Sequence, residues 1–128
     1  MINRDNLIFM AETAAENAYA PYSNFNVGAC ILCSSGEAFT GFNIENSSFG
    51  ATVCAERVAL FKAISEGEMS FVAMAVTAMP CGICLQTLSE FCDKDFLIIA
   101  KNKNDEYEEY SLSELLTHPF DKGESLDI

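Results

Sequence analysis

Two short segments of the chain carry side chains that could do chemistry. Residues 54–57, Cys-Ala-Glu-Arg, offer a thiol and a carboxylate, and residues 80–84, Pro-Cys-Gly-Ile-Cys, offer two further thiols. Three thiolates leave a tetrahedral zinc ion one open position for water, which a catalytic zinc site needs. Zinc lowers the pKa of bound water towards neutrality, and Glu56 is placed to move the released proton. The two segments predict a catalytic zinc site with Cys54, Cys81 and Cys84 as ligands.

The three expected zinc ligands lie at or near the N-terminal ends of two predicted helices. Cys54 and Cys81 each fall where a helix is expected to begin, and Cys84 follows one turn after Cys81 on the same helix face. Free N–H groups and the positive end of the helix dipole favour thiolate there. The alternatives are a structural zinc site or buried cysteines. A structural site usually needs a fourth ligand, and His118, the only histidine, lies far along the chain before Pro119.

Periodicity and turn signals predict the elements around these ligands. Asn3 can cap a first helix, and Ser111 with Glu114 matches a capping box for a last helix. Residues 34–36, Ser-Ser-Gly, predict the turn of a hairpin. Residues 71–77 are almost continuously apolar, which predicts burial on both faces. Helices are expected at 3–19, 54–66, 81–91 and 111–117, and strands at 26–33, 37–42, 71–77, 96–100 and 106–110. This order predicts one α/β domain over residues 1–128, a three-layer α/β/α fold with a mixed five-stranded sheet.

The composition of the chain argues against nucleic acids and membranes as binding partners. The chain has 128 residues, and its net charge is −12 with only seven basic residues, which are scattered. No basic stripe could neutralise a phosphate backbone, so we expect a small uncharged substrate and no nucleic acid. No apolar run is long enough for a membrane span, and no signal peptide is apparent, so we expect a cytoplasmic protein that does not bind membranes.

The other three cysteines are expected to be structural. In an intracellular chain, metal binding explains a C-x-x-C pair better than a disulfide does. Cys30 and Cys33 also form C-x-x-C, but they lie in an apolar run expected to be a strand, where an odd separation points two side chains to opposite faces. We therefore expect both to be buried thiols, and Cys92 ends an expected helix.

The ligand pattern belongs to a recognisable family. A ligand, any residue, Glu, and then P-C-x-x-C is the pattern of the zinc deaminases of nucleobases. The chain resembles the small cytidine deaminases with a three-cysteine site from about Tyr19 to Phe120, including residues 22–25, 27–29, 40–41 and 43–46. The resemblance implies hydrolysis of cytidine and 2′-deoxycytidine to uridine and 2′-deoxyuridine with release of ammonia, in pyrimidine salvage. It also implies one Zn²⁺ per subunit, an antiparallel first strand pair with later strands parallel, and a homotetramer whose neighbours complete each pocket.

The same resemblance implies roles for individual residues. Glu56 would carry both proton transfers, and Arg57 would hydrogen-bond the thiolate sulfurs and offset their negative charge. Asn43 and Glu45 would bind the ribose, chiefly its 3′-hydroxyl, and Phe25 would pack on the base. Backbone groups of Ala55 and Met79 would contact the amide edge of the base, and the aromatic rings of Phe49 and Phe120 would lie near the pocket, Phe120 reaching a neighbouring subunit. The alternatives are a surface arginine at 57, loop polar residues at 43 and 45, and a core aromatic at 25.

Four departures from the family pattern bear on the substrate. The connection Thr77-Ala78-Met79-Pro80 is shorter than usual and borders the pocket, so we expect a more open or differently roofed site. Leu85 stands in place of a common arginine, Phe49 in place of a frequent tyrosine and Asn26 in place of a common proline. None of these touches the ligands or Glu56. The alternatives are therefore a modified cytosine nucleoside or a nucleoside antibiotic such as blasticidin S, and a non-catalytic zinc or nucleoside-binding protein.

Overall fold

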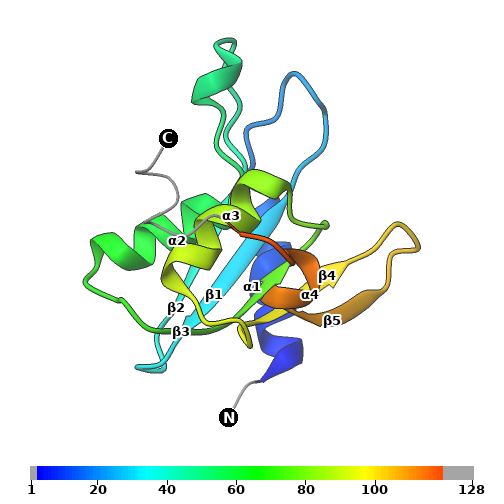
Figure 1. Cartoon of the computed structure of the whole chain (residues 1–128). Coiled ribbons are helices and arrows are strands. Elements are labelled where there is room, and N and C mark those ends of the chain that lie inside the picture. The colour runs from blue at the N-terminus through cyan, green and yellow to red at the C-terminus, as the bar shows by residue number, and fades with distance from the viewer. Residues whose placement is uncertain (1–2, 120–128) are drawn as a thin grey trace.

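A computed structural model describes residues 3–119 of the chain, and its elements follow the predicted order (Figure 1). The main helices are α1 (Arg4–Ala15), α2 (Ala55–Ser65), α3 (Gly82–Phe91) and α4 (Leu112–Leu115), with a short 3₁₀ turn, η1, at Phe49–Ala51. The strands are β1 (Gly28–Cys33), β2 (Ala38–Phe42), β3 (Phe71–Val76), β4 (Leu97–Lys101) and β5 (Tyr107–Ser111). Asn3 caps α1, and the capping box of Ser111 and Glu114 is formed, both as predicted.

The five strands form one mixed sheet in the order β2-β1-β3-β4-β5. The first pair, β1 and β2, is antiparallel, and β3 and β4 are parallel, as the resemblance implied. The expectation that the later strands are parallel is wrong for β5, which runs antiparallel to β4. Its physical reason is the short connection through residues 102–106, since parallel strands need a crossover of a dozen residues or more.

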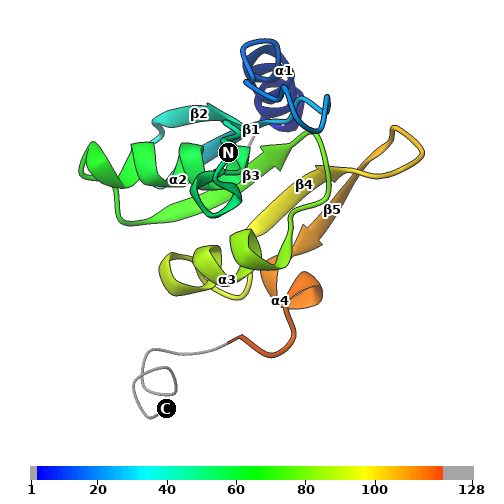
Figure 2. The same cartoon turned by 90° about the horizontal axis from the view of Figure 1, so that it is seen from above.

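The predicted three layers are confirmed. Leu7 and Ala11 of α1 share a core with Cys30, Ala73 and Ile99 on one face of the sheet. Buried apolar residues of α2, α3 and α4 share a second core with the opposite face. Figure 2 shows α1 on one side of the sheet and α3 and α4 on the other.

Cys30 and Cys33 lie on opposite faces of the sheet, and both are buried, as the odd spacing predicted. Burial raises the pKa of each thiol to about 11. Cys92 ends α3 and packs half-buried against the core beneath it. All three thiols therefore have packing roles.

Helix α1 is shorter than expected, because tertiary contacts override its helical spacing. It ends at Ala15 rather than Tyr19. Tyr19 leaves the helix to pair with the loop after β2: its N–H donates to the Asn43 carbonyl (2.9 Å), and its carbonyl accepts from the Glu45 N–H (2.8 Å). This pairing fixes the segment 20–27 beside the loop 43–53.

Some other helices and strands begin or end a few residues away from the predicted positions. Strand β1 begins at Gly28 rather than at residue 26, because the side chain of Asn43 takes the backbone groups of the preceding residues. Helix α4 ends at Leu115 rather than at residue 117. In β3, residues 73–76 are buried as predicted, whereas Phe71 and Val72 are half-buried.

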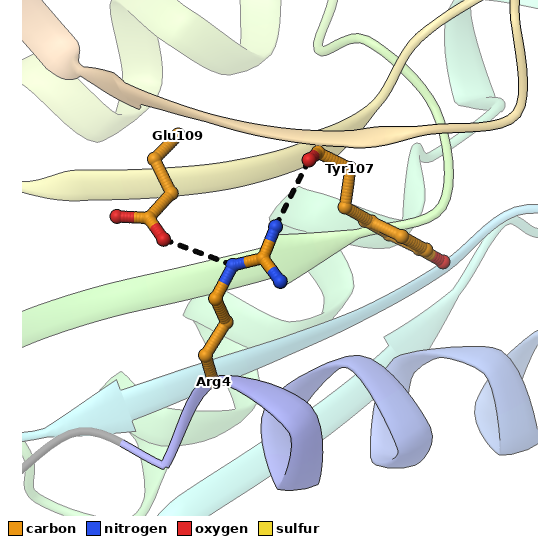
Figure 3. Close-up of polar contacts among 3 residues, drawn as sticks. All are labelled: Arg4, Tyr107 and Glu109. Atoms are coloured by element: carbon orange, nitrogen blue, oxygen red, sulfur yellow. Dashed lines mark hydrogen bonds and ion pairs between the residues drawn. The ribbon is translucent and has the colours of Figure 1, made fainter.

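Helix α1 is tied to the edge strand β5 (Figure 3). The Arg4 Nη2 donates to the Tyr107 carbonyl (2.9 Å), and the Arg4 Nε forms an ion pair with Glu109 (2.9 Å). Further along α1, Glu12 accepts a hydrogen bond from the Tyr107 hydroxyl (2.9 Å). Both ends of α1 are thereby fixed against the sheet. Within residues 3–119, no helix has the length and apolar character that crossing a membrane would need.

Helix α2 approaches the sheet unusually closely at its first turn. A Cβ on Gly41 of β2 would lie 2.5 Å from the Ala59 nitrogen and 2.6 Å from the Ala55 carbonyl oxygen. The helix presents Ala55, Ala59 and Ala63 to the core, and all three are fully buried. Gly41 and the small alanines therefore set the position from which α2 presents its N-terminal residues.

Candidate active site

The three cysteines of the predicted site lie at two helix N-termini. Cys54 is the N-cap of α2 and Cys81 is the N-cap of α3, and neither side chain makes a capping hydrogen bond. Cys84 lies in the first turn of α3 and is buried. The sulfur atoms are therefore free to turn towards one another, in the arrangement predicted from the sequence.

The geometry of the three sulfurs fits a tetrahedral metal. The Sγ atoms of Cys54 and Cys81 are 3.8 Å apart, and those of Cys81 and Cys84 are 3.4 Å apart. All three lie within 4.8 Å of one another. Zinc–sulfur bonds of about 2.3 Å at tetrahedral angles place sulfur atoms about 3.8 Å apart. The donor set and spacing thus suit one zinc ion with a fourth position left over, and His118 is not part of the cluster.

Arg57 lies against this cluster rather than in solvent. Its Nη2 is 3.7 Å from the Cys54 Sγ and 3.4 Å from the Thr52 carbonyl oxygen. A hydrogen bond with Cys84 and the guanidinium of Arg57 hold the pKa of the Cys54 thiol well below its usual range. The same pairing with Cys54, together with burial, raises the pKa of Cys84. Cys54 is therefore the thiol of this pair that ionises first.

Glu56 is the buried carboxylate of the site. It lies in the first turn of α2, and only 4% of its surface is exposed. Burial raises the pKa of this carboxyl to about 7, and the negative charge of Cys54 contributes to the rise. A carboxyl with this pKa can both accept and donate a proton near neutral pH.

A small cavity of about 140 Å³, here called the central cavity, brings most of the predicted residues together. It is lined by Phe25, Val27, Asn43, Cys54, Ala55, Glu56, Ala78, Met79 and Cys81. Val27 and Ala78 were not among the predicted site residues. Val27 lies two residues after Phe25, and Ala78 directly precedes Met79, which was the available signal.

A larger space borders the central cavity, and another lies among the loop residues. A groove of about 700 Å³, the side groove, shares Phe25, Ala78 and Met79 with it. The rest of the side groove is formed by α1, Asn26, Thr77 and the turn between β4 and β5. A hollow of about 360 Å³, the loop cavity, contains Glu45 and Phe49 together with Tyr22, Ser23, Asn46 and Thr52. Glu45 and Phe49 are thus not brought to the central cavity, and Phe120 lies outside the described residues.

Asn43 and Glu45 hold the segment that carries Phe25. The Asn43 Oδ1 accepts from the Val27 N–H, and its Nδ2 donates to the Phe25 carbonyl, both at 2.9 Å. The Glu45 carboxylate accepts from the N–H groups of Tyr22 (3.0 Å) and Ser23 (3.1 Å) and from the Ser23 hydroxyl. The Ser23 hydroxyl bond is the main cause that lowers the pKa of Glu45. The two side chains therefore fix the shape of the wall beside the cluster.

Comparison with known proteins identifies the family. The model of the cytidine and deoxycytidylate deaminase zinc-binding region matches residues 1–100. A cytidine deaminase of Halalkalibacterium halodurans is 46% identical over 93% of this chain and 95% of its own length. One of Sporosarcina psychrophila is 43% identical over 92% of this chain and 91% of its own length.

A solved structure agrees with these sequence matches. The crystal structure of cytidine deaminase from Burkholderia pseudomallei superposes with a TM-score of 0.87 and 38% identity, covering 93% of this chain and 100% of the other. The match therefore extends over the sheet, the helices and the segments that carry the three thiols and Glu56. This chain belongs to the cytidine and deoxycytidylate deaminase family.

Proposed function

We propose that the protein deaminates cytidine and 2′-deoxycytidine by hydrolysis, giving uridine and 2′-deoxyuridine with release of ammonia, as a step of pyrimidine salvage. The observation that carries this proposal is the buried Glu56 carboxyl, which lines one cavity with Cys54 and Cys81 of the three-thiol cluster. A binding site alone has no need of a buried carboxyl that can shuttle a proton beside the thiols. The names of the matched relatives support the same reaction.

Glu56 would move the protons of the reaction. A zinc ion held by Cys54, Cys81 and Cys84 would supply the acidity that makes water a nucleophile at neutral pH. Glu56 would accept the proton of the attacking water, pass it to N3 of the pyrimidine, and later assist the departure of ammonia from C4.

Arg57 would balance the charge of the metal site. Three thiolates and Zn²⁺ sum to −1, and this excess weakens the metal as an acid. The guanidinium near the Cys54 Sγ withdraws part of that negative charge, as groups around metal ligands commonly do. Arg57 would therefore act on the reaction through the thiolates, without touching the nucleoside.

The nucleoside would be recognised by the walls of the central and loop cavities. Phe25 would pack on the base, while backbone groups of Ala55 and Met79 would bind its amide edge. The second N–H of the Asn43 amide and the remaining lone pairs of Glu45 would bind the ribose 3′-hydroxyl. Phe49 and Phe120 would lie near the sugar, Phe120 from a neighbouring subunit.

The proposal is tested by ammonia release from cytidine, 2′-deoxycytidine, free cytosine and blasticidin S, using protein with a measured zinc content. We expect turnover of the two simple nucleosides and none of cytosine, because a site built to bond a hydroxyl rejects ligands that lack it. Zinc-loaded protein that releases no ammonia from either nucleoside would refute the proposal.

We infer that the active unit is a homotetramer whose subunits share their sites. Several large apolar side chains are exposed in the single chain, among them Phe49 at 80% and Phe9 at 66%. Contact with neighbouring subunits would remove such side chains from water. Sedimentation would show the tetramer, and a fully active monomer would refute it.

A cytoplasmic location is inferred from the thiols. None of the six cysteines is in a disulfide in the structure, and a site made of three thiolates needs a reducing compartment. Thiol-modifying experiments on intact cells would test this, since a protein in an oxidising compartment would carry disulfides.

A further inference from the structure

We propose that Ser23 is a positioning residue that sets how strictly the site requires a 3′-hydroxyl on the sugar of its substrate. This inference rests on the proposed function, in which Glu45 binds the ribose. The observation that carries it is the Ser23 hydroxyl, which joins the Glu45 carboxylate to the backbone of Phe25. Ser23 and Glu45 both line the loop cavity.

The contacts of Glu45 leave its two oxygens unequal. Oε1 accepts from the N–H groups of Tyr22 (3.0 Å) and Ser23 (3.1 Å), whereas Oε2 accepts from the Ser23 hydroxyl. A carboxylate offers about four acceptor positions, two on each oxygen. Oε1 is therefore filled, and Oε2 is the oxygen with acceptor capacity left for a ligand. Among residues 3–119 the Ser23 hydroxyl is the one donor to Oε2, so it fixes the rotation of the carboxylate.

The direction of the Ser23 hydroxyl is itself fixed. Its Oγ accepts from the Phe25 N–H (3.1 Å), and a carboxylate can only accept, so the hydroxyl proton is donated to Glu45. A tight turn supports this arrangement. Asn24 adopts a φ of 59°, which Asn tolerates better than most residues, and its N–H donates to the Ala20 carbonyl (3.0 Å).

Asn43 supplies the group that complements Oε2. Its Oδ1 accepts from the Val27 N–H and one of its amide N–H groups donates to the Phe25 carbonyl, which leaves the second N–H for a ligand. A hydroxyl both donates and accepts. The 3′-hydroxyl of the proposed substrate can therefore donate to Glu45 Oε2 and accept from Asn43. A sugar without this hydroxyl would cover both groups and leave them unpaired, which costs binding free energy.

This penalty depends on a carboxylate that cannot turn away. With the Ser23 hydroxyl in place, Oε2 stays where the 3′-hydroxyl must lie. Without it, Oε2 could rotate towards water when the hydroxyl is missing, which lowers the penalty. The freed side chain would also lose more conformational entropy on binding a sugar that has the hydroxyl. Both effects reduce the discrimination between the two sugars.

The test compares 2′-deoxycytidine with 2′,3′-dideoxycytidine, which differ only in the 3′-hydroxyl. We expect Ser23→Ala to lower the ratio of their kcat/KM values about 3- to 10-fold, the effect of releasing one immobilised side chain. Ser23→Thr keeps the hydroxyl and should keep the ratio. The control is Ser47→Ala in the same loop, because the Ser47 hydroxyl is exposed and makes no hydrogen bond among residues 3–119. A general loss of folding would lower both rates together, so an unchanged ratio in Ser23→Ala would overturn the inference.

A double-mutant cycle tests whether Ser23 acts through Glu45. Once Glu45→Ala has removed the carboxylate, adding Ser23→Ala should leave the ratio of kcat/KM values unchanged. If the two substitutions lower the ratio independently, Ser23 does not act by positioning Glu45 and the inference is wrong.

Binding measurements separate this inference from the proposed function. Calorimetry with 2′-deoxyuridine and 2′,3′-dideoxyuridine gives a ratio of Kd values that needs no turnover. We expect Ser23→Ala to bring this ratio closer to one. Turnover of cytidine with equal treatment of the two sugars by the wild type would overturn the inference and leave the proposed function standing. If zinc-loaded protein turns over no nucleoside, the proposed function fails, and the Kd ratio in Ser23→Ala still decides the role of Ser23.

Discussion

The Arg57 guanidinium lies 3.7 Å from the Cys54 sulfur, one turn further along the same helix. Because Cys54 caps α2 and Arg57 follows in its first turn, one helix end supplies a metal ligand, the buried Glu56 carboxyl and the cation that balances the thiolates. The position of this helix end therefore decides both metal binding and proton transfer.

Removal of the Arg57 charge should slow the reaction with zinc still bound. We expect Arg57→Gln to lower kcat by roughly 10–100-fold, as is typical of groups that act through metal ligands. Lys62→Gln is the matched control, because Lys62 lies on the same helix and donates to the Thr40 carbonyl instead of a sulfur. Equal losses in the two variants, or a kcat for Arg57→Gln like that of the wild type, would contradict the role of Arg57.

A methyl group at Gly41 should displace the start of α2. Its Cβ would lie 2.5 Å from the Ala59 nitrogen, which is closer than real contacts allow. We expect Gly41→Ala to lower stability by about 1–3 kcal/mol, the usual cost of overpacking, and to weaken zinc binding in a competition with a chelator. Gly50→Ala, where nothing lies within 4 Å of the added Cβ, is the control. Unchanged zinc affinity in Gly41→Ala would show that the site does not depend on this close approach.

Chelation should expose one set of thiols and leave another protected. We expect native zinc-loaded protein to resist alkylation at Cys54, Cys81 and Cys84, and a chelator to make these thiols reactive. Cys30 and Cys33 should stay unmodified near neutral pH in both states, because they are buried and their pKa is about 11. Mass spectrometry of the labelled peptides measures this, and early labelling of Cys30 would contradict the packing.

The Glu45 contacts should give a pH-dependent contribution to stability. The hydrogen bonds from Ser23 and Tyr22 lower the pKa of Glu45 in the folded state. A lowered folded pKa means that the stabilisation is full above the unfolded value, about 4.3, and is lost as the pH falls through the folded value. We expect the difference in Tm between wild type and Glu45→Gln to be constant near neutral pH and to shrink below about pH 4. A difference independent of pH would contradict the charge-dependent hydrogen bonds.

The helix starts that carry the predicted zinc ligands were easier to predict from the sequence than the segments that surround the central cavity. Cys54 and Cys81 were placed at helix starts from spacing alone, because capping positions and apolar periodicity are local features. The end of α1 was missed, because Tyr19 pairs with residues 43–45, which are distant in sequence. The internal bonds of Asn43 and Glu45 were missed for the same reason, since either side chain could equally have faced solvent.

The direction of β5 was readable from local residues, whereas the side groove depends on segments that are distant in sequence. Residues 102–106 are rich in Asn and Asp, which favour tight turns, and Asp105 adopts a φ of 62°. Because a tight turn joins antiparallel strands, this composition could have predicted the direction of β5. The short connection 77–80 predicted an open site. That a groove borders the central cavity depends on where α1 and the β4–β5 turn lie, which no local pattern specifies.

The most direct test of the account is the turnover of Glu56→Gln with cytidine, measured beside its zinc content. Glutamine keeps the size of the side chain and removes its ability to carry a proton. We predict one zinc per subunit, as in the wild type, and a fall in kcat of roughly 10²–10⁴-fold, the usual contribution of a positioned acid–base group. A variant that retains both its zinc and wild-type turnover would contradict the central claim that Glu56 moves the protons of the reaction.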